Sequence, residues 1–268
     1  MENKNHGYAL VTGGTSGIGY ELAKILAENG YNLIIVARNE NDLLAVSVKF
    51  KQDYNVDVIT FSKDLFYPEN AFMLHAEINS KNLQVDILIN DAEQGQYGTF
   101  LDTDIRRELD IINLNISSLV VLTKLFLQDM MARGSGKILN LSSVASKMPG
   151  PWQAIYHGTK AFVQSFTEAV RSEMKDSGIT ITALLPGPTD TDFFQKANML
   201  ESKIVREGEL ASAAEVAKDG FKALMDGDDK IVSGLKNKMQ VAMANITPDA
   251  AVADKMKKQQ APVEESHQ

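Results

Sequence analysis

The sequence contains no cysteine, which excludes disulfide bonds and thiolate chemistry. Such a composition is compatible with a reducing compartment. The four histidines are scattered along the chain, and together with the missing cysteines this leaves no pattern typical of a metal centre. We therefore predict that the protein has no metal site.

Positive charge and long apolar runs are also scarce. Lysine and arginine number 27 against 35 acidic residues, and the net charge of -8 offers no electrostatic footprint for nucleic acid or an anionic membrane. The longest apolar stretch, residues 116–127, contains Lys124 and is too short to span a bilayer. The N-terminal stretch MENKNHG lacks the apolar segment of a signal peptide. We expect a soluble, cytoplasmic protein with no transmembrane segment and no nucleic-acid partner.

Short apolar runs alternate with longer amphipathic segments through most of the chain. The runs are mostly continuous rather than alternating, which is typical of strands buried on both faces. Strands are predicted at residues 8–12, 32–37, 56–61, 86–90, 137–142 and 179–186. Helical patterns lie at 17–29, 39–53, 68–81, 103–132 and 151–176, followed by a helix near 211–226, a short strand near 230–232 and a methionine-dotted helical segment from about 235.

This alternation predicts an α/β fold with a doubly wound parallel β-sheet (a Rossmann fold), about seven strands and helices on both faces. A ligand site is then expected beyond the carboxyl ends of the strands. No linker rich in proline, glycine or serine divides the pattern, so we predict one domain over residues 1–258. Residues 259–268 are predicted to form a disordered tail.

The stretch TGGTSGIG (12–19) follows the first predicted strand and opens the first helix. Glycines at such a turn let the backbone approach a pyrophosphate, and the helix N-terminus offers free N–H groups to it. A glycine-rich turn that binds nothing is the alternative. The position after the first strand of a βαβ unit favours dinucleotide binding.

The end of the second strand reads Ala37-Arg38-Asn39, with no acidic residue. A carboxylate at this point binds the 2′-hydroxyl of NAD, whereas an arginine accommodates the 2′-phosphate of NADP. A merely solvated arginine is the alternative. The missing carboxylate favours NADP(H) over NAD(H).

TGGTSGIG, NLNISS (113–118), NLSS (140–143), YHGTK (156–160) and PGPTDT (186–191) together resemble the short-chain dehydrogenase/reductase family. The resemblance covers about residues 7–232, and its specificity lies in the joint occurrence of these motifs at these spacings. It implies an oxidoreductase that transfers a hydride between NADP(H) and a carbonyl or alcohol. It also implies a homodimer or homotetramer built on the helices 103–132 and 151–176, and a substrate lid at about 188–210.

The resemblance implies a catalytic set of Tyr156, Lys160, Ser143 and Asn115. Tyr156 is the expected general acid/base, Lys160 its partner at the nicotinamide ribose, and Ser143 the group that polarises the substrate carbonyl. Asn115 is expected to hold a water in a proton relay. The implied cofactor-binding residues are Gly13, Thr15, Ser16, Gly17, Ile18, Gly19, Arg38, Asn39, Asp64, Leu65, Asn90, Ala92, Tyr156, Lys160, Pro186, Gly187, Thr189 and Thr191.

The YHGTK spacing makes chemical sense of the tyrosine and lysine. Residues i and i+4 stand on one helix face, and an ammonium about 4 Å from a phenolate is worth about 4 kcal/mol at an effective dielectric near 20. That corresponds to about three pKa units, so the pKa of Tyr156 is expected to lie close to 7. Desolvation raises the pKa again by part of this shift. Alone, the pair would be an ordinary exposed one. His157 points to another face and is interpreted as structural.

The pattern breaks after the fourth strand, where the family usually has Asn-Asn-Ala-Gly and this chain has NDAE, Asn90 to Glu93. Asp91 replaces an amide that donates and accepts hydrogen bonds by a carboxylate that only accepts. Glu93 replaces a glycine where a cofactor ribose passes close to the backbone. Either Glu93 weakens the binding of an anionic cofactor, or it points outward with little effect.

The substrate is not specified by the sequence. Phe193, Phe194, Met199 and Leu200, with Trp152, either line an apolar substrate site or pack beneath the lid. The segment KIVSGLKNKMQ (230–240) resembles one in ketoacyl-reductase-like bacterial members of the family, and the segment 239–256 either covers a subunit interface or lies against lipid. A second class of function also stays open, a cofactor-binding sensor or partner-binding protein with little catalysis.

Overall fold

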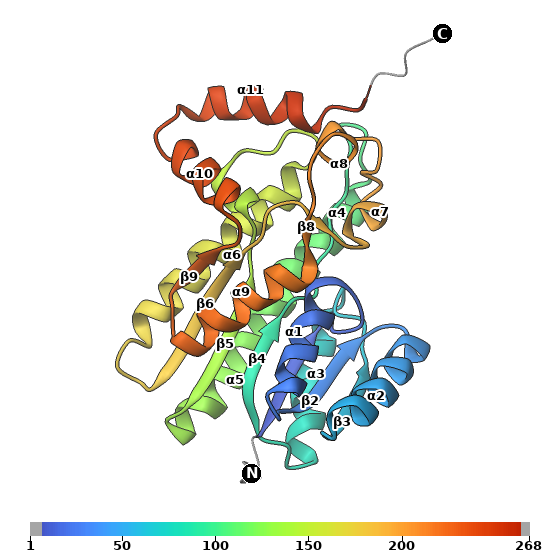
Figure 1. Cartoon of the computed structure of the whole chain (residues 1–268), viewed down its shortest axis with the longest axis vertical. Helices are drawn as coiled ribbons and strands as arrows, with labels where there is room; N and C mark the ends of the chain where they lie inside the picture. The colour runs from blue at the N-terminus through green and yellow to red at the C-terminus, as the bar shows by residue number, and fades with distance from the viewer. Residues whose placement is uncertain (1–6, 264–268) are drawn as a thin grey trace.

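The computed structural model describes residues 7–263, and a seven-stranded parallel sheet forms its centre (Figure 1). The strand order is β3-β2-β1-β4-β5-β6-β9. The strands are β1 (Tyr8–Thr12), β2 (Asn32–Ala37), β3 (Val58–Ser62), β4 (Val85–Asn90), β5 (Gly136–Leu141), β6 (Ile179–Leu185) and β9 (Lys230–Val232). This arrangement confirms the predicted Rossmann-type α/β fold.

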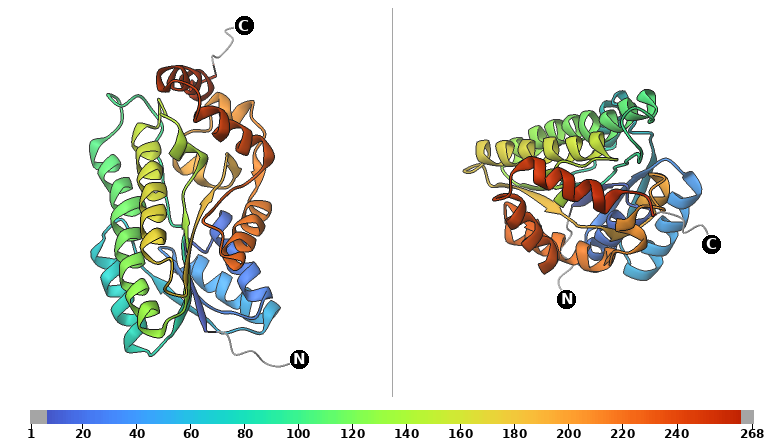
Figure 2. Two further views of the ribbon diagram at one scale, coloured as in Figure 1. Left: turned by 90° about the vertical axis from the view of Figure 1, so that its left-hand side faces the viewer. Right: turned by 90° about the horizontal axis from the view of Figure 1, so that it is seen from above.

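Helices cover both faces of the sheet, as its edge-on view shows (Figure 2). The helices of the layers are α1 (Gly17–Glu28), α2 (Glu40–Tyr54), α3 (Glu69–Ser80), α4 (Ile105–Ile112), α5 (Leu119–Arg133), α6 (Ala154–Glu173) and α9 (Ala213–Asp226). Strand β2 is buried continuously from Leu33 to Val36, because alternate side chains enter the two cores on opposite sheet faces. One core lies under α1, α2 and α9 and the other under α3 and α5.

The predicted helix 103–132 is interrupted by a π-helical turn, η1 (Asn113–Ser118), between α4 and α5. A single inserted residue in a helix leaves the apolar periodicity on both sides nearly intact, so the sequence pattern does not reveal it. The turn carries Asn115, whose side chain is buried. Such turns occur often at functional sites.

The C-terminal part lies across the carboxyl ends of the strands (Figure 1). Its elements are β7 (Thr189–Asp190), α7 (Phe193–Lys196), α8 (Lys203–Arg206), β8 (Ala211–Ser212), α10 (Leu235–Ala244) and α11 (Asp249–Gln260). Residues 259–263 differ from the predicted tail: Ser202 bridges Pro262, and the Val263 amide donates to the Glu201 carbonyl at 2.8 Å. The remainder of that predicted tail lies outside the described residues.

One helical stretch in the described part of the chain, Ile105–Arg133, has the length and composition of a membrane span. It also supplies Ile111, Leu122, Phe126 and Met130 to the protein's interior. Its apolar character is therefore accounted for by packing against the sheet and α3.

Candidate active site

The strand order reverses between β1 and β4, which is where open α/β sheets bind ligands. Thr12, at the end of β1, ties the two strand ends together. Its Oγ1 donates to the Ile89 carbonyl at 3.3 Å and accepts from the amides of Asp91 and Ala92 at 3.0 and 3.1 Å. The NDAE segment is thereby fixed against the glycine loop.

The glycine loop needs its glycines. Gly13 has φ +73°, and a Cβ there would lie 3.1 Å from the Ala92 amide nitrogen. A Cβ on Gly19 would lie 2.7 Å from the Gly13 carbonyl oxygen. Ser16 caps α1 without a side-chain hydrogen bond, so the N–H groups of the first helical turn are available to a phosphate. These features fit the pyrophosphate of a dinucleotide.

A cavity of about 550 Å³ opens beside this loop. Eleven of the predicted cofactor residues line it: Gly13, Thr15, Ser16, Gly17, Ile18, Arg38, Asn39, Asp64, Leu65, Ala92 and Thr191. Phe66 lines it as well, and the guanidinium carbon of Arg38 lies 5.1 Å from its ring centroid. Phe66 was not predicted, because a single phenylalanine after Leu65 gives no sequence signal. The residues fit a dinucleotide along this part of the cavity.

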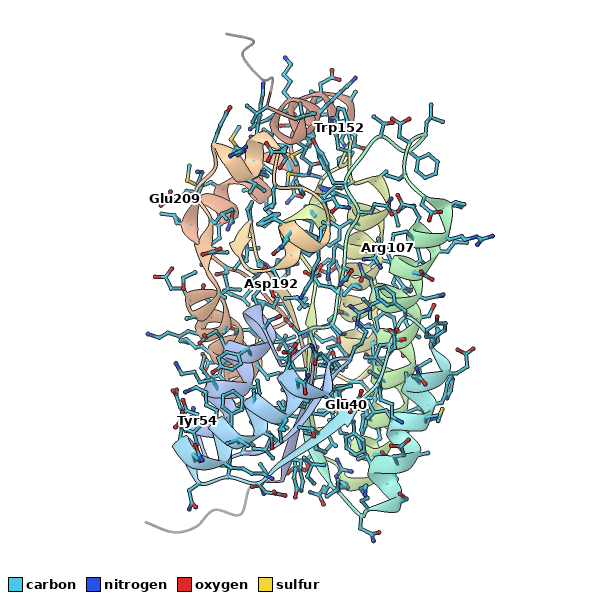
Figure 3. All side chains as sticks on the ribbon, turned by 90° about the vertical axis from the view of Figure 1, so that its right-hand side faces the viewer. Glu40, Tyr54, Arg107, Trp152, Asp192 and Glu209 are labelled. Atoms are coloured by element: carbon cyan, nitrogen blue, oxygen red, sulfur yellow. The ribbon has the colours of Figure 1, made fainter. Side chains whose placement is uncertain are left out.

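A second cavity, of about 640 Å³, adjoins the first. It is lined by the predicted residues Ser143, Tyr156, Pro186, Gly187 and Thr189. Ile18, Glu93, Thr191 and Phe193 line both cavities and therefore mark their junction. In Figure 3, Asp192 of this lid segment lies above the blue N-terminal elements, and Arg107 lies on the green helix α4.

Ser143, Tyr156 and Lys160 meet at this junction. Ser143 lies in the loop after β5, where its Oγ donates to the Pro186 carbonyl at 3.3 Å and acts to lower the pKa of Tyr156. Tyr156 and Lys160 come from the first two turns of α6, with the lysine Nζ 5.8 Å from the tyrosine ring centroid. Lys160 is only 2% exposed, and its Nζ donates to the Leu141 carbonyl at 2.6 Å. The structure thus brings three of the four predicted catalytic residues together.

Asn115 lies behind these residues rather than at a cavity. Its Nδ2 donates to the Gln94 carbonyl at 2.9 Å and to Thr159 Oγ1 at 3.0 Å, and its Oδ1 accepts from the Gln94 amide at 3.0 Å. The amide therefore braces the NDAE loop against α6. Asn115 positions this loop, and its predicted water-holding role stays a prediction.

Three other predicted residues also lie behind the cavity walls. Asn90 donates to Thr123 at 3.0 Å and to Asn140 Oδ1 at 2.9 Å, inside the sheet. Gly19 packs against Gly13, and Lys160 is covered by its neighbours. Asn90 and Gly19 therefore support the walls of the site, and Lys160 places a positive charge behind them.

Glu93 is the functional residue that the predicted set omits. Its carboxylate forms an ion pair with the Lys160 Nζ and lies near enough to the Tyr156 hydroxyl for each to affect the pKa of the other. Burial raises the pKa of Glu93, against the opposing effects of Lys160 and Tyr156. The two sequence alternatives are thus resolved: Glu93 points inward. The only sequence signal was the departure from the family's glycine.

The pKa of Tyr156 is raised well above its ordinary value in this arrangement, first by burial and then by the Glu93 charge. The expectation of a tyrosine near 7 is therefore wrong for this geometry. The YHGTK spacing does bring lysine and tyrosine to one helix face, but the lysine is paired with Glu93, whose charge raises the pKa of Tyr156.

The Asp91 side chain lies against Gly13 and Gly19 of the glycine loop. The side chain is buried, and burial followed by the nearby Glu93 charge raises its pKa well above the ordinary carboxyl value. Among the described residues its Oδ1 is buried with no hydrogen-bond partner, and the predicted acceptor-only character of Asp91 stays a prediction. The Gly19 amide hydrogen-bonds to this side chain.

Asp91→Asn is expected to stabilise the protein increasingly as the pH rises. Because the folded pKa of Asp91 is raised, its contribution to stability is full below about pH 4 and is lost as the pH rises through the folded pKa. Asparagine has no such loss, so we expect a gain of about 1 kcal/mol or more at pH 8 and a smaller one at pH 5. Urea unfolding at both pH values measures the gap; a constant gap would contradict a titrating Asp91.

His157 is structural, as interpreted from its position. It is buried, its Nδ1 lies 2.8 Å from the Met148 carbonyl oxygen, and the Gln260 amide lies 3.0 Å from its Nε2. Burial lowers its pKa. The histidine therefore fastens α11 to the catalytic helix.

The C-terminal helices line the second cavity, which the sequence did not predict. Met256 and Gln260 of α11 face it, with Val252 buried one turn earlier. Their spacing of four residues is the signal that could have identified this face. Trp152 instead stacks on Tyr97 at 5.7 Å between ring centroids, and Leu200 is exposed.

Within residues 7–263, no cluster of three or more acidic or histidine side chains is arranged to hold a metal ion.

A doubly wound sheet, a glycine loop and a Ser/Tyr/Lys cluster define a dinucleotide-dependent oxidoreductase class. Residues 7–201 match the family model described as short chain dehydrogenase, and the chain belongs to the short-chain dehydrogenase/reductase family. It is 32% identical over 186 residues to the very-long-chain 3-oxoacyl-CoA reductase of Rattus norvegicus, covering 67% of this chain and 58% of that protein. It is also 32% identical over 255 residues to the dehydrogenase/reductase SDR family member 7B of Mus musculus, covering 91% and 75%.

Solved structures show the same fold. A short-chain dehydrogenase from Sphingobium yanoikuyae in complex with NADPH has a TM-score of 0.80 and 25% identity, covering 90% of this chain and 96% of that chain. An actinorhodin polyketide ketoreductase variant with NADPH has a TM-score of 0.76 and 26% identity, covering 88% and 100%.

Proposed function

We propose that the protein is an NADP(H)-dependent oxidoreductase that interconverts a carbonyl compound and its alcohol. The observation that carries this proposal is the meeting of Ser143, Tyr156 and Lys160 where the glycine-loop cavity adjoins a second cavity. Two solved structures that resemble this chain are complexes with NADPH.

The predicted cofactor residues that line the first cavity would hold the dinucleotide, with the phosphates at the N-terminus of α1 and the adenine near Asp64 and Leu65. The bound nicotinamide supplies or accepts the hydride. In the reducing direction Ser143 donates a hydrogen bond to the substrate oxygen, and Tyr156 gives that oxygen its proton as the hydride reaches the carbon. Lys160 stabilises the tyrosinate that results.

The preference for NADP(H) is tested at Arg38. This residue is exposed at the end of β2 and no acid lines the cavity beside it at position 37 or 39. We expect Arg38→Ala to weaken NADPH binding about tenfold or more and to leave NADH binding nearly unchanged, because only NADPH carries the 2′-phosphate. Calorimetric titration with both cofactors measures this. Equal losses for the two would overturn the assignment of Arg38, and binding of neither by the unaltered protein would overturn the proposed function.

The substrate is proposed to be an apolar carbonyl compound. Phe193, Phe194, Met199, Met148 and Met256 line the second cavity. The curated relative from rat is named a very-long-chain 3-oxoacyl-CoA reductase, which favours a 3-oxoacyl compound as the first to be screened. A screen of such thioesters and of bulky ketones with NADPH tests the class.

A second candidate function is a cofactor-binding sensor with little catalysis. The raised pKa of Tyr156 and the pairing of Lys160 with Glu93 favour it, since both oppose proton transfer. Binding of NADPH without oxidation by any carbonyl in the screen would favour the sensor. Turnover with any of them would exclude it.

The cytoplasmic location and the homodimer or homotetramer are also proposals. Exposed apolar side chains on α4 and α6, Ile105, Leu109 and Phe162, are consistent with a helical subunit interface.

A further inference from the structure

Glu93 occupies the junction of the two cavities, in contact with both members of the proposed proton shuttle. Its carboxylate forms an ion pair with Lys160 and raises the pKa of Tyr156, and the side chains of Glu93 and Lys160 are 18% and 2% exposed. This junction is where a nicotinamide and its ribose would have to lie for a hydride to reach a substrate beside Tyr156 and Ser143. The Glu93 carboxylate and the ribose hydroxyls would therefore both bind to the Nζ of Lys160.

The backbone that carries Glu93 is held on both sides. Before it, the amides of Asp91 and Ala92 donate to Thr12 Oγ1 at 3.0 and 3.1 Å. After it, both the amide and the carbonyl of Gln94 bond to the Asn115 side chain. Four hydrogen bonds hold the residues on either side of Glu93, so the backbone of this loop is fixed in place. Rotation of the Glu93 side chain would release Lys160 without moving this backbone.

The surrounding charges favour the position in which Glu93 pairs with Lys160. Lys160 is the cation in direct contact, and the pKa of Asp91 is raised, which reduces the repulsion between the two neighbouring acids. On the lid, Asp192 and Lys196 line the first cavity at exposed positions and pair with each other at 3.5 Å. Arg107 of α4 donates a hydrogen bond to the side-chain oxygen of Gln94. None of these groups replaces Lys160 as the partner of Glu93.

We propose that Glu93 is a gate at the nicotinamide end of the cofactor cavity: its carboxylate competes with the nicotinamide ribose for Lys160, and binding of NADP(H) displaces it. The gate rests on the proposed function, since it requires a dinucleotide in the first cavity. It sets the affinity for the complete cofactor but leaves the adenine end unaffected. It also supplies the buried Lys160 with a counter-charge whenever the ribose does not.

The test compares NADPH with 2′,5′-ADP, a fragment that lacks the nicotinamide and its ribose. Calorimetric titrations use the full chain, Glu93→Gly and Glu93→Gln. We expect both variants to bind NADPH at least about tenfold more tightly, which is about 1.4 kcal/mol, and to bind 2′,5′-ADP as the unaltered protein does. Glu93→Gln keeps the size of the side chain, so it separates competition for Lys160 from simple obstruction of space.

Asp192→Asn is the matched control. It removes one negative charge from the same cavity without touching Lys160 or Tyr156, and its carboxylate makes no helix-capping bond. We expect its NADPH affinity to change by less than about threefold. An equal gain in Asp192→Asn and Glu93→Gln would overturn the gate, because general repulsion of an anionic cofactor would then explain both.

Two further results separate the gate from the proposed function. Normal 2′,5′-ADP binding with no tightening of NADPH in either Glu93 variant overturns the gate and leaves the function standing. No binding of either ligand by any form overturns both. Thermal unfolding gives a second measurement: Glu93→Gln is expected to melt at a lower temperature without cofactor and to gain more from saturating NADPH than the unaltered protein does. Equal gains overturn the gate.

Discussion

Tyr156→Phe is expected to lower kcat for carbonyl reduction by about 10²- to 10⁴-fold, because it removes the hydroxyl proposed to give the substrate oxygen its proton. The Tyr156 ring packs against Phe193 at 4.9 Å between ring centroids, and phenylalanine keeps this contact. The affinity for NADPH and the unfolding midpoint are therefore expected to change little. Steady-state kinetics with the best ketone from the screen and a calorimetric titration measure the two effects.

Tyr54→Phe is the control for this prediction. Tyr54 ends α2, far from Asp192 and the lid in Figure 3, and it lines neither cavity. Its replacement should leave kcat unchanged. If Tyr156→Phe retained more than about a tenth of kcat, another group would have to deliver the proton, and Ser143 would be the first to test.

Much of this fold follows directly from the sequence, because strands buried on both faces are read from continuous apolar runs. The runs predict all seven strands of the central sheet to within about two residues of their observed bounds. The glycine loop was predictable for a related reason: Gly13 and Gly19 occupy places where a Cβ would collide with backbone. The sequence alone was sufficient to predict the structure wherever that structure depends on residues close together in the chain.

The parts that were not predicted depend on contacts between distant residues. Asn115 has the expected place beside the catalytic helix, yet its bonds to Gln94 and Thr159 are visible only once the two segments are assembled. The docking of α11 through Gln260 and His157 joins residues 103 apart in the chain. Glu93 was recognised as an anomaly, but its direction depends on Lys160, which the fold brings to it.

Because folding pairs Glu93 with Lys160, we expect Lys160→Met to lower the stability of the fold strongly. The substitution leaves the Glu93 carboxylate without its cation, and removing one partner of a buried ion pair typically costs about 3–5 kcal/mol. Loss of the single bond to the Leu141 carbonyl adds little by comparison. For a chain of this size we expect the melting temperature to fall by about 10 °C or more, measured by calorimetry without cofactor.

The pH dependence and a second substitution identify the cause of this loss. Lys160 lowers the pKa of Glu93, so its removal raises that pKa further, and the folded variant should lose stability as the pH rises from about 5 to 8. Adding Glu93→Gln to Lys160→Met removes the unpaired carboxylate, and the double variant should recover most of the lost stability and its pH dependence should flatten. A double variant no more stable than Lys160→Met alone would mean that Lys160 supports the fold through packing, and that its pairing with Glu93 contributes little.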